Sequence, residues 1–216
     1  MLTTWQAPGG SVEQAIRCGS ATGPCLLVLP AWFDEANKTR HFTVETMRML
    51  AQRGIGSVLP DLPGCNESMA ALEAQTLSSW REAASAAAAH FGCSHVLAIR
   101  AGANLAPALP GFAYAPLAGK SALRALLRAR TIAAKEAGRP ETTESLLETG
   151  KAEGLELAGY RLGAAMVADL SQAALPDSPL AKLEPGGPGL WLRAEPEHNA
   201  EQAAALANLI AESVAR

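Results

Sequence analysis

An arginine, Arg100, occupies the position in this sequence where a catalytic nucleophile is expected. The segment Ala98-Ile99-Arg100-Ala101-Gly102 follows a short apolar run and leads into a short helix. This is the setting of the catalytic G-x-S-x-G turn, called here the elbow. The serine of that turn becomes a nucleophile when a histidine removes its proton. A guanidinium, with a pKa above about 12, can neither lose a proton nor attack a carbonyl carbon. We therefore exclude conventional acyl-enzyme chemistry at Arg100.

Further polar side chains follow the other predicted strands. This is the edge at which open parallel sheets bind their ligands, because the loops after neighbouring strands meet there. One group of these side chains follows the first buried strand, and another follows the second. The candidate ligand-binding residues among them are Asp34, Glu35, Asn37, Arg40 and Ser68.

Arg100 and the acidic residues Asp34 and Glu35 allow two interpretations, since their loops are expected to converge. In one, Arg100 forms an ion pair with an acidic neighbour, because a buried guanidinium without a partner costs several kcal/mol in lost solvation. In the other, Arg100 faces an open cleft and binds a carboxylate, a phosphate or a sugar acid through two parallel hydrogen bonds. The ion pair is the favoured interpretation.

Alternating buried strands and helices predict the α/β class, with a doubly wound, mostly parallel sheet and helices on both of its faces. Short apolar runs predict parallel strands at Cys25–Leu29, Gly56–Leu59, His95–Ile99, Gly111–Ala115 and Leu190–Arg193. Apolar residues at helical spacing predict helices over residues 41–52 and 76–90, and a last helix after residue 199. The N-terminal segments Thr3–Gln6 and Val12–Arg17 suit an antiparallel hairpin at the sheet edge.

Residues 1–216 are predicted to form a single domain, with a helical segment at about residues 119–160 that departs from the strand–helix alternation. Lys120, Arg124 and Arg128 form a basic stripe there, at i,i+4 spacing on a helix. We interpret the stripe as a solvated helix face, with a basic docking surface beside the cleft as the alternative. Residues 139–154 are expected to be a mobile surface loop, and the whole region is a candidate lid.

Composition and charge narrow the range of partners. A formal net charge of −3 gives no field that would attract nucleic acid, and no window of sequence approaches the roughly 18 apolar residues of a membrane span. The start of the sequence lacks the pattern of a signal peptide, so we expect a cytoplasmic protein. Four cysteines without a C-x-x-C pair, and histidines without ligand spacing, predict neither a metal site nor a cofactor.

Four ordered segments resemble the exosortase A system-associated hydrolases of the hydrolase 2 type, which belong to the α/β-hydrolase superfamily. They are Leu29-Pro30 with the run from Asp34 to Arg40, DLPGCNES from Asp61 to Ser68, AIRAGANLA from Ala98 to Ala106, and LRALLRAR with LELAGY at residues 123–130 and 155–160. The resemblance spans residues 25–165, and beyond it this chain is shorter. It implies an α/β-hydrolase fold, a link to bacterial exopolysaccharide and protein-sorting loci, and arginine at the elbow as a family trait.

The fold implied by this resemblance keeps its catalytic histidine late in the chain, in the loop before the last helix, which is where His198 stands. The flanking residues Glu195, Pro196 and Glu197 are equally typical of an exposed surface loop. Both interpretations of His198 therefore stay open. His41, His90 and His95 are given no catalytic role.

Two functions follow from these residues. The first is a degenerate α/β-hydrolase that binds a small acyl or acidic ligand, or a protein partner, in an exopolysaccharide or exosortase-type system. The second is an active ester or thioester hydrolase in which His198 activates water and Asn37 or loop amides hold the oxyanion. Arg100 favours the first hypothesis, and the family resemblance favours the second. We further expect that His198 forms no nucleophile pair with a serine or a cysteine.

Overall fold

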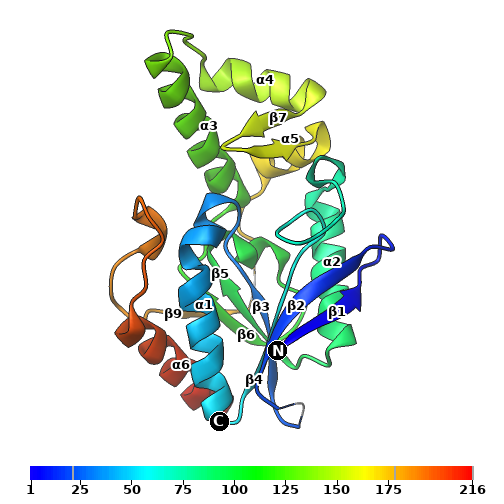
Figure 1. The fold of residues 1–216 in the computed structure, drawn as a ribbon, viewed down its shortest axis with the longest axis vertical. Helices are drawn as coiled ribbons and strands as arrows, with labels where there is room; N and C mark the ends of the chain where they lie inside the picture. Colours follow the sequence, from blue (N-terminus) through cyan, green and yellow to red (C-terminus); the bar gives the residue numbers. More distant parts are fainter. Residues whose placement is uncertain (21, 178, 216) are drawn as a thin grey trace.

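A seven-stranded sheet forms the centre of the computed structural model, which describes residues 1–20, 22–177 and 179–215. Its strand order is β1-β2-β4-β3-β5-β6-β9 (Figure 1). The strands are β1 (Leu2–Gln6), β2 (Val12–Cys18), β3 (Cys25–Leu29), β4 (Gly56–Pro60), β5 (His95–Ile99), β6 (Gly111–Tyr114) and β9 (Ala181–Leu183). The strands from β4 to β9 in this order run parallel, and β1 and β2 form an antiparallel edge hairpin. The mostly parallel sheet predicted from the sequence is confirmed.

Alternate residues of the central strands enter two separate apolar cores. In β3, Leu27 and Leu29 belong to one core, whereas Leu26 and Val28 belong to the other. The helices that cover these cores are α2 (Leu77–His90) on the first face, and α1 (Asp34–Gln52) and α6 (Ala200–Val214) on the second. A strand buried on both faces needs a continuous apolar run, which is why its sequence predicted β3 correctly.

The fifth parallel strand predicted from the sequence, Leu190–Arg193, is wrong. Leu190–Leu192 is a turn of 3-10 helix, η3, and the strand that pairs with β6 is β9. Leu190 is buried and Leu192 is 79% exposed, whereas residues two apart in a strand lie on the same face of the sheet. The apolar run suggested a strand, but its burial does not follow strand periodicity.

The ring of Trp191 in η3 packs at the carboxyl end of the sheet. It lies over the guanidinium of Arg100 and against the ring of Tyr114. The sequence did not predict β9, because this strand is short and its first two residues are exposed, so it has no apolar run.

Helix α1 begins at Asp34, earlier than the predicted start at His41. Phe33 precedes it with a φ of 56°, and no side chain caps its first turn. Two acidic residues in that turn, Asp34 and Glu35, favour the helix because they face its positive end. The polar residues expected in a loop, such as Asn37, therefore lie on the first two turns of a helix.

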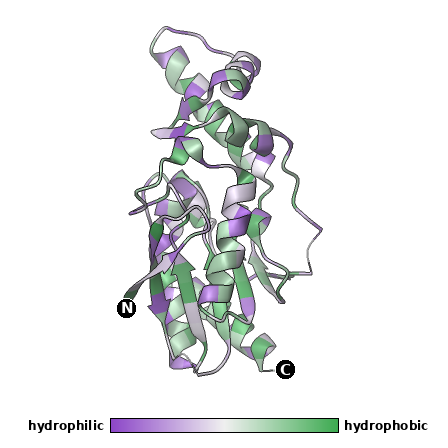
Figure 2. Cartoon of the chain, turned by 90° about the vertical axis from the view of Figure 1, so that its right-hand side faces the viewer, coloured by the Kyte–Doolittle hydropathy of each residue, from purple (hydrophilic) through white to green (hydrophobic). Residues whose placement is uncertain are grey.

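The region after β6 forms a cap beyond the carboxyl ends of the strands (Figures 1 and 2). It consists of α3 (Gly119–Glu136), α4 (Thr143–Glu153), the hairpin β7 (Leu155–Leu157) and β8 (Tyr160–Leu162), and α5 (Ala164–Gln172). The surface loop expected at residues 139–154 is wrong for most of its length, because α4 occupies it and the hydroxyl of Thr142 accepts the N–H of Ser145 as a cap. Among the described residues, no helix combines the length and apolar character of a bilayer span.

The chain turns sharply after β5 into η2 (Arg100–Leu105), as the sequence predicted. Gly102 allows this turn to lie directly against the end of β3. A Cβ atom at Gly102 would lie 2.4 Å from the carbonyl oxygen of Leu29 and 2.6 Å from that of Pro30. No side chain fits between these backbone groups, so glycine is required there.

We expect Gly102→Ala to lower the free energy of unfolding by about 1–3 kcal/mol, the usual effect of overpacking, because two backbone carbonyls must move. Urea denaturation of the purified protein measures the loss. Gly9→Ala is the matched control, since nothing lies within 4 Å of its Cβ position. Its effect should stay within about 0.5 kcal/mol. Equal losses in the two variants would contradict the close approach at Gly102.

Candidate functional site

The turn after β5 has a strained backbone with Arg100 at its tip. Arg100 has a φ of 53°, a left-handed value that is uncommon for residues other than glycine. β5 ends at Ile99, and η2 begins at Arg100 itself. Strain of this kind persists only where the surrounding structure holds it in place. The side-chain contacts of Arg100 provide that hold.

The guanidinium of Arg100 forms a two-pronged ion pair with Glu35. Nε donates to Oε2 and Nη2 donates to Oε1, each at 2.9 Å. Nη1 donates to the carbonyl oxygen of Ala115, also at 2.9 Å. The side chains of Arg100 and Glu35 are only 12% and 23% exposed. Of the two acidic neighbours considered from the sequence, Asp34 and Glu35, the structure pairs Glu35 with the arginine.

An aromatic ring covers one face of the same guanidinium. Cζ of Arg100 lies 4.2 Å from the centroid of the Trp191 ring, which is a cation–π distance. Trp191 also meets Tyr114 edge-on, with 5.8 Å between ring centroids. The sequence analysis missed Trp191 because it assigned this segment to a strand. The Nε and Nη2 groups of Arg100, which would bind an acidic ligand, already donate to Glu35.

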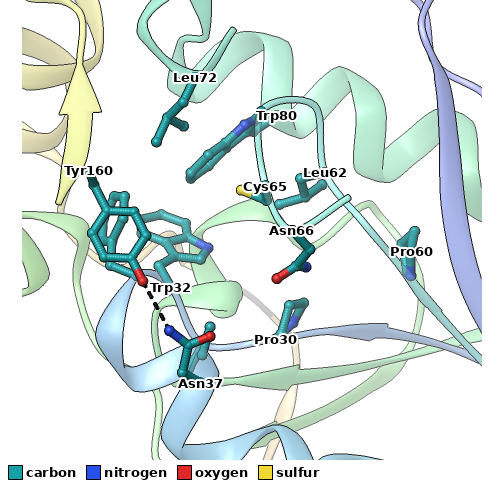
Figure 3. Close-up of a pocket in the computed structure, with 14 residues that line it drawn as sticks. Pro30, Trp32, Asn37, Pro60, Leu62, Cys65, Asn66, Leu72, Trp80 and Tyr160 are labelled. Carbon is teal, nitrogen blue, oxygen red and sulfur yellow. Dashed lines mark hydrogen bonds between the residues drawn. The ribbon is translucent and has the colours of Figure 1, made fainter. Parts of the chain in front are cut away.

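Asp34 and Asn37, near the start of α1, have partners other than Arg100. Asp34 pairs with Lys38 one turn along the helix, with 2.6 Å between Oδ2 and Nζ. The side-chain nitrogen of Asn37 donates to the hydroxyl of Tyr160 at 3.3 Å (Figure 3). Since Tyr160 belongs to the β7–β8 hairpin, Asn37 lies where the sheet domain meets the cap.

Arg40 and Ser68 contact two buried acidic residues. Nη2 of Arg40 lies 3.8 Å from Oδ1 of Asp61. The hydroxyl of Ser68 donates to Oε1 of Glu13 at 2.9 Å and accepts the backbone N–H of Gly64 at 2.8 Å. Through these two hydrogen bonds Ser68 ties the loop after β4 to Glu13 of β2.

Those two carboxylates lie behind that loop. Glu13 is fully buried and Asp61 is 4% exposed. Burial raises the pKa of Asp61, against the hydrogen bond from Asn66 at 2.6 Å and the charge of Arg40. Burial, with the charges of Asp61 and Glu13, raises the pKa of Cys65 to about 12. Cys65 therefore stays a protonated thiol at neutral pH, which is a poor nucleophile.

His198 stacks on His41 of α1. The ring centroids are 4.1 Å apart and the ring planes differ by 19°. Nδ1 of His198 is buried, and among the described residues it has no hydrogen-bond partner. His198 lines neither of the two spaces that lie near the elbow. The structure therefore does not bring His198 together with Arg100 or Asn37 in one site.

The first of these spaces is an apolar cleft of about 240 Å³ beside the elbow. Ala101 of η2, Leu126 of α3 and the exposed Leu192 contribute to its walls. Among the described residues, Asp34 and Glu35 are the charged groups that line it, and both already have cationic partners. The cleft therefore offers an apolar surface next to a neutralised ion pair.

The second space, called here the aromatic cavity, lies between α1, the loop after β4, α2 and the β7–β8 hairpin (Figure 3). Its volume is about 90 Å³. Four of the ten Phe, Trp and Tyr residues in the chain line it: Trp32, Phe33, Trp80 and Tyr160. Their rings meet edge-on or tilted, with centroids 5.2 to 6.3 Å apart. The sequence analysis missed this cavity, although a Trp-Phe pair directly after the first buried strand was a visible signal.

Comparisons with known proteins identify the fold but no family. No family model matches the chain, and no curated protein matches it. An alpha/beta hydrolase from Penicillium sp. sh18 is similar in structure, with 14% identity, a TM-score of 0.52, and coverage of 80% of this chain and 73% of that chain. This similarity and the mostly parallel sheet show an α/β-hydrolase-like fold.

Two other solved structures are similar over shorter lengths. A proline iminopeptidase-related protein from Thermus thermophilus has 22% identity and a TM-score of 0.47, with coverage of 71% of this chain and 57% of that chain. An epoxide hydrolase from Vigna radiata has 20% identity and a TM-score of 0.41, with coverage of 49% of this chain. The match spans only 33% of the epoxide hydrolase.

Removing one partner of the Arg100–Glu35 pair should destabilise the protein strongly. Removing one partner of a fully buried ion pair lowers the free energy of unfolding by about 3–5 kcal/mol. The partial exposure of Glu35 makes the expected loss smaller here. We expect Arg100→Met and Glu35→Gln to couple in a double-mutant cycle by at least about 1 kcal/mol, because the double variant leaves no charge unpaired. Urea denaturation of the four proteins gives the coupling.

The exposed pair Arg193–Glu197 is the control for this cycle. Its atoms lie 2.8 Å apart, but both side chains are more than half exposed, at 51% and 54%. Coupling there should be below about 1 kcal/mol. A coupling at Arg100–Glu35 no larger than in this control would show that the elbow pair is not a buried clamp.

The raised pKa of Asp61 predicts a pH-dependent stability. The folded protein binds a proton at Asp61 more readily than the unfolded chain, so this contribution favours folding at low pH and is lost as pH rises through the raised pKa. Relative to wild type, Asp61→Asn should therefore gain stability as pH rises from about 4 to 7. Urea denaturation across this range measures the difference, and a difference independent of pH would contradict it.

Glu141→Gln provides the opposite case. The hydrogen bond and charge of Arg130 lower the pKa of Glu141, so its contribution is present at neutral pH and is lost as pH falls. Relative to wild type, Glu141→Gln should lose stability as pH rises over the same range. Opposite slopes for the two variants separate the burial of Asp61 from a general effect of removing a carboxylate.

Proposed function

We propose that this chain is a degenerate α/β-hydrolase-fold protein that binds a small ligand or a protein partner and forms no acyl-enzyme. The observation that carries the proposal is the closed elbow. The nucleophile position holds Arg100, whose guanidinium is bound by Glu35 and covered by Trp191. Covalent acyl transfer needs a deprotonated hydroxyl or thiol at that point, and a paired guanidinium supplies neither.

Neither Ser68 nor Cys65, in the loop after β4, is placed or ionised to attack an acyl carbon beside the elbow. Ser68 lines neither the cleft nor the aromatic cavity, and Cys65 keeps its proton because its pKa is raised to about 12. A nucleophile also needs an adjacent base to accept its proton. His198 is stacked on His41 and lines neither the cleft nor the aromatic cavity.

The alternative, an ester or thioester hydrolase that uses His198 and Asn37, has no comparable observation in its favour. A base that activates water must lie within hydrogen-bond reach of that water beside the reacting carbonyl. The ring of His198 packs on His41 instead, and the side-chain nitrogen of Asn37 donates to Tyr160. This geometry supports the binding role.

The ligand we propose is a small acyl or other neutral molecule, not an acid. The guanidinium that an acidic ligand would require is neutralised by Glu35, and among the described residues no cation lines the aromatic cavity. The resemblance of four segments to exosortase A system-associated hydrolases supports a role in a bacterial exopolysaccharide or exosortase-type system. The ordered set of segments, and no single one of them, carries that part of the proposal.

Purified protein should hydrolyse short p-nitrophenyl esters and acyl thioesters no faster than buffer does. Arg100→Ser restores a hydroxyl at the elbow but no positioned base and acid, so it should give at most marginal hydrolysis. Release of nitrophenol or free thiol measures both. Turnover by wild type at about 1 s⁻¹ or more, abolished in a folded Arg100→Ala variant, would overturn the proposal.

A further inference from the structure

The indole N–H of Trp32 is a buried donor without an acceptor. Trp32 is 5% exposed, and its Nε1 has no hydrogen-bond partner among the described residues. Buried polar groups in folded proteins almost always have a partner, so an orphan calls for a group that completes it. Figure 3 shows this nitrogen directed into the aromatic cavity, on the side that faces Asn66.

Two other tryptophans show what sets Trp32 apart. Trp80, in the same cavity wall, donates its N–H to the carbonyl oxygen of Pro63 at 2.9 Å. Trp5 is also buried without an acceptor, but it lines neither the aromatic cavity nor the cleft. Trp32 therefore combines a missing acceptor with a place in the wall of the aromatic cavity. A ligand oxygen in that cavity would accept this hydrogen bond.

Polar groups at the rim of the cavity can hold the same ligand. The side-chain nitrogen of Asn66 donates to Asp61 at 2.6 Å, which turns the amide oxygen of Asn66 toward the cavity (Figure 3). Asn37 and Tyr160 close another side through their hydrogen bond. A ligand oxygen near Trp32 would thus meet both a donor and an acceptor, while the ligand body lies against the rings.

The surroundings favour a neutral ligand. Among the described residues that line the aromatic cavity, none is charged. An anion there would lose its hydration without gaining a cationic partner. A cation would face the N–H of Trp32, which is a donor and not an acceptor.

The volume of the cavity limits the size of the ligand. At about 10–15 Å³ for each water-sized group, a cavity of about 90 Å³ holds roughly six to nine non-hydrogen atoms. We propose that the aromatic cavity binds a neutral molecule of the size of one ring, with an apolar body and one oxygen that accepts the Trp32 N–H. This inference rests on the proposed binding role and adds the site and the chemical class of the ligand.

Cyclohexanone is a suitable probe because it has this size and one carbonyl oxygen. Methylenecyclohexane is its matched partner, with a methylene group in place of the oxygen. In proton–nitrogen correlation spectra of the full-length protein, cyclohexanone should shift the indole signal that disappears in Trp32→Phe. Trp32→Phe should weaken cyclohexanone binding about tenfold and change methylenecyclohexane binding less than about twofold, because only the ketone loses a hydrogen bond.

Two further variants control this experiment. Trp5→Phe removes a second orphan indole outside the cavity and should leave the binding of both probes unchanged. Ala36→Leu fills the cavity from α1 and should abolish the binding of both probes while the Trp32 donor remains. If Trp32→Phe fails to fold, the wild-type spectra and Ala36→Leu still decide whether the cavity is the site.

Several results would overturn the inference. They are the absence of an indole shift with cyclohexanone at millimolar concentration, an equal loss of both probes in Trp32→Phe, and tighter binding of cyclohexanecarboxylate than of cyclohexanone. Failure of the proposed function is read separately, from ester turnover. A protein that turns over esters but still binds cyclohexanone at Trp32 would refute the function and keep the site.

Discussion

The charge of Arg100 is the constraint around which the carboxyl end of the sheet is organised. A guanidinium that is only 12% exposed needs acceptors, because leaving it unpaired would cost several kcal/mol. Its partners come from three different segments: Glu35 on α1, the carbonyl of Ala115 at the end of β6, and the ring of Trp191 in η3. The contacts of this one side chain therefore fix the ends of β5 and β6, the start of α1 and a late segment of the chain relative to one another.

The backbone at the elbow keeps the form that presents a serine hydroxyl in other proteins, while the side chain reverses its chemistry. Arg100 has a left-handed φ of 53°, and a Cβ atom at Gly102 would lie 2.4 Å from the carbonyl oxygen of Leu29. An α/β-hydrolase-like fold therefore does not decide activity here, because activity depends on the groups placed at the site. At this elbow a strained turn holds an ion pair in place of a nucleophile.

The sequence predicts the centre of this fold well and its edges poorly, for a physical reason. β3 and β5 are buried on both faces, so their continuous apolar runs define them without further context. β9 is short and largely exposed, and the apolar run Leu190-Trp191-Leu192 suggests a strand although it forms a turn of 3-10 helix. Helix α4 lies in a polar stretch of sequence. It depends on the hydrogen bond from the Ser145 N–H to the Thr142 side chain at its start, and on α3 and α5 packed beside it. These elements are set by tertiary contacts that no local pattern records.

The candidate site also has one part that the sequence could predict, the Arg100–Glu35 pair, and one that it could not, the aromatic cavity. The first turn of α1 contributes to both parts. Pairing of Glu35 with Arg100 could be anticipated because both residues follow adjacent parallel strands, whereas the walls of the aromatic cavity come from segments far apart in the sequence. Successive residues of a helix point about 100° apart, so Glu35 faces the elbow while Ala36 and Asn37 line the cavity. The left-handed φ of Phe33 directly precedes this turn and helps to set its direction. The contacts of Arg100 that close the elbow thus also hold one wall of the aromatic cavity in place.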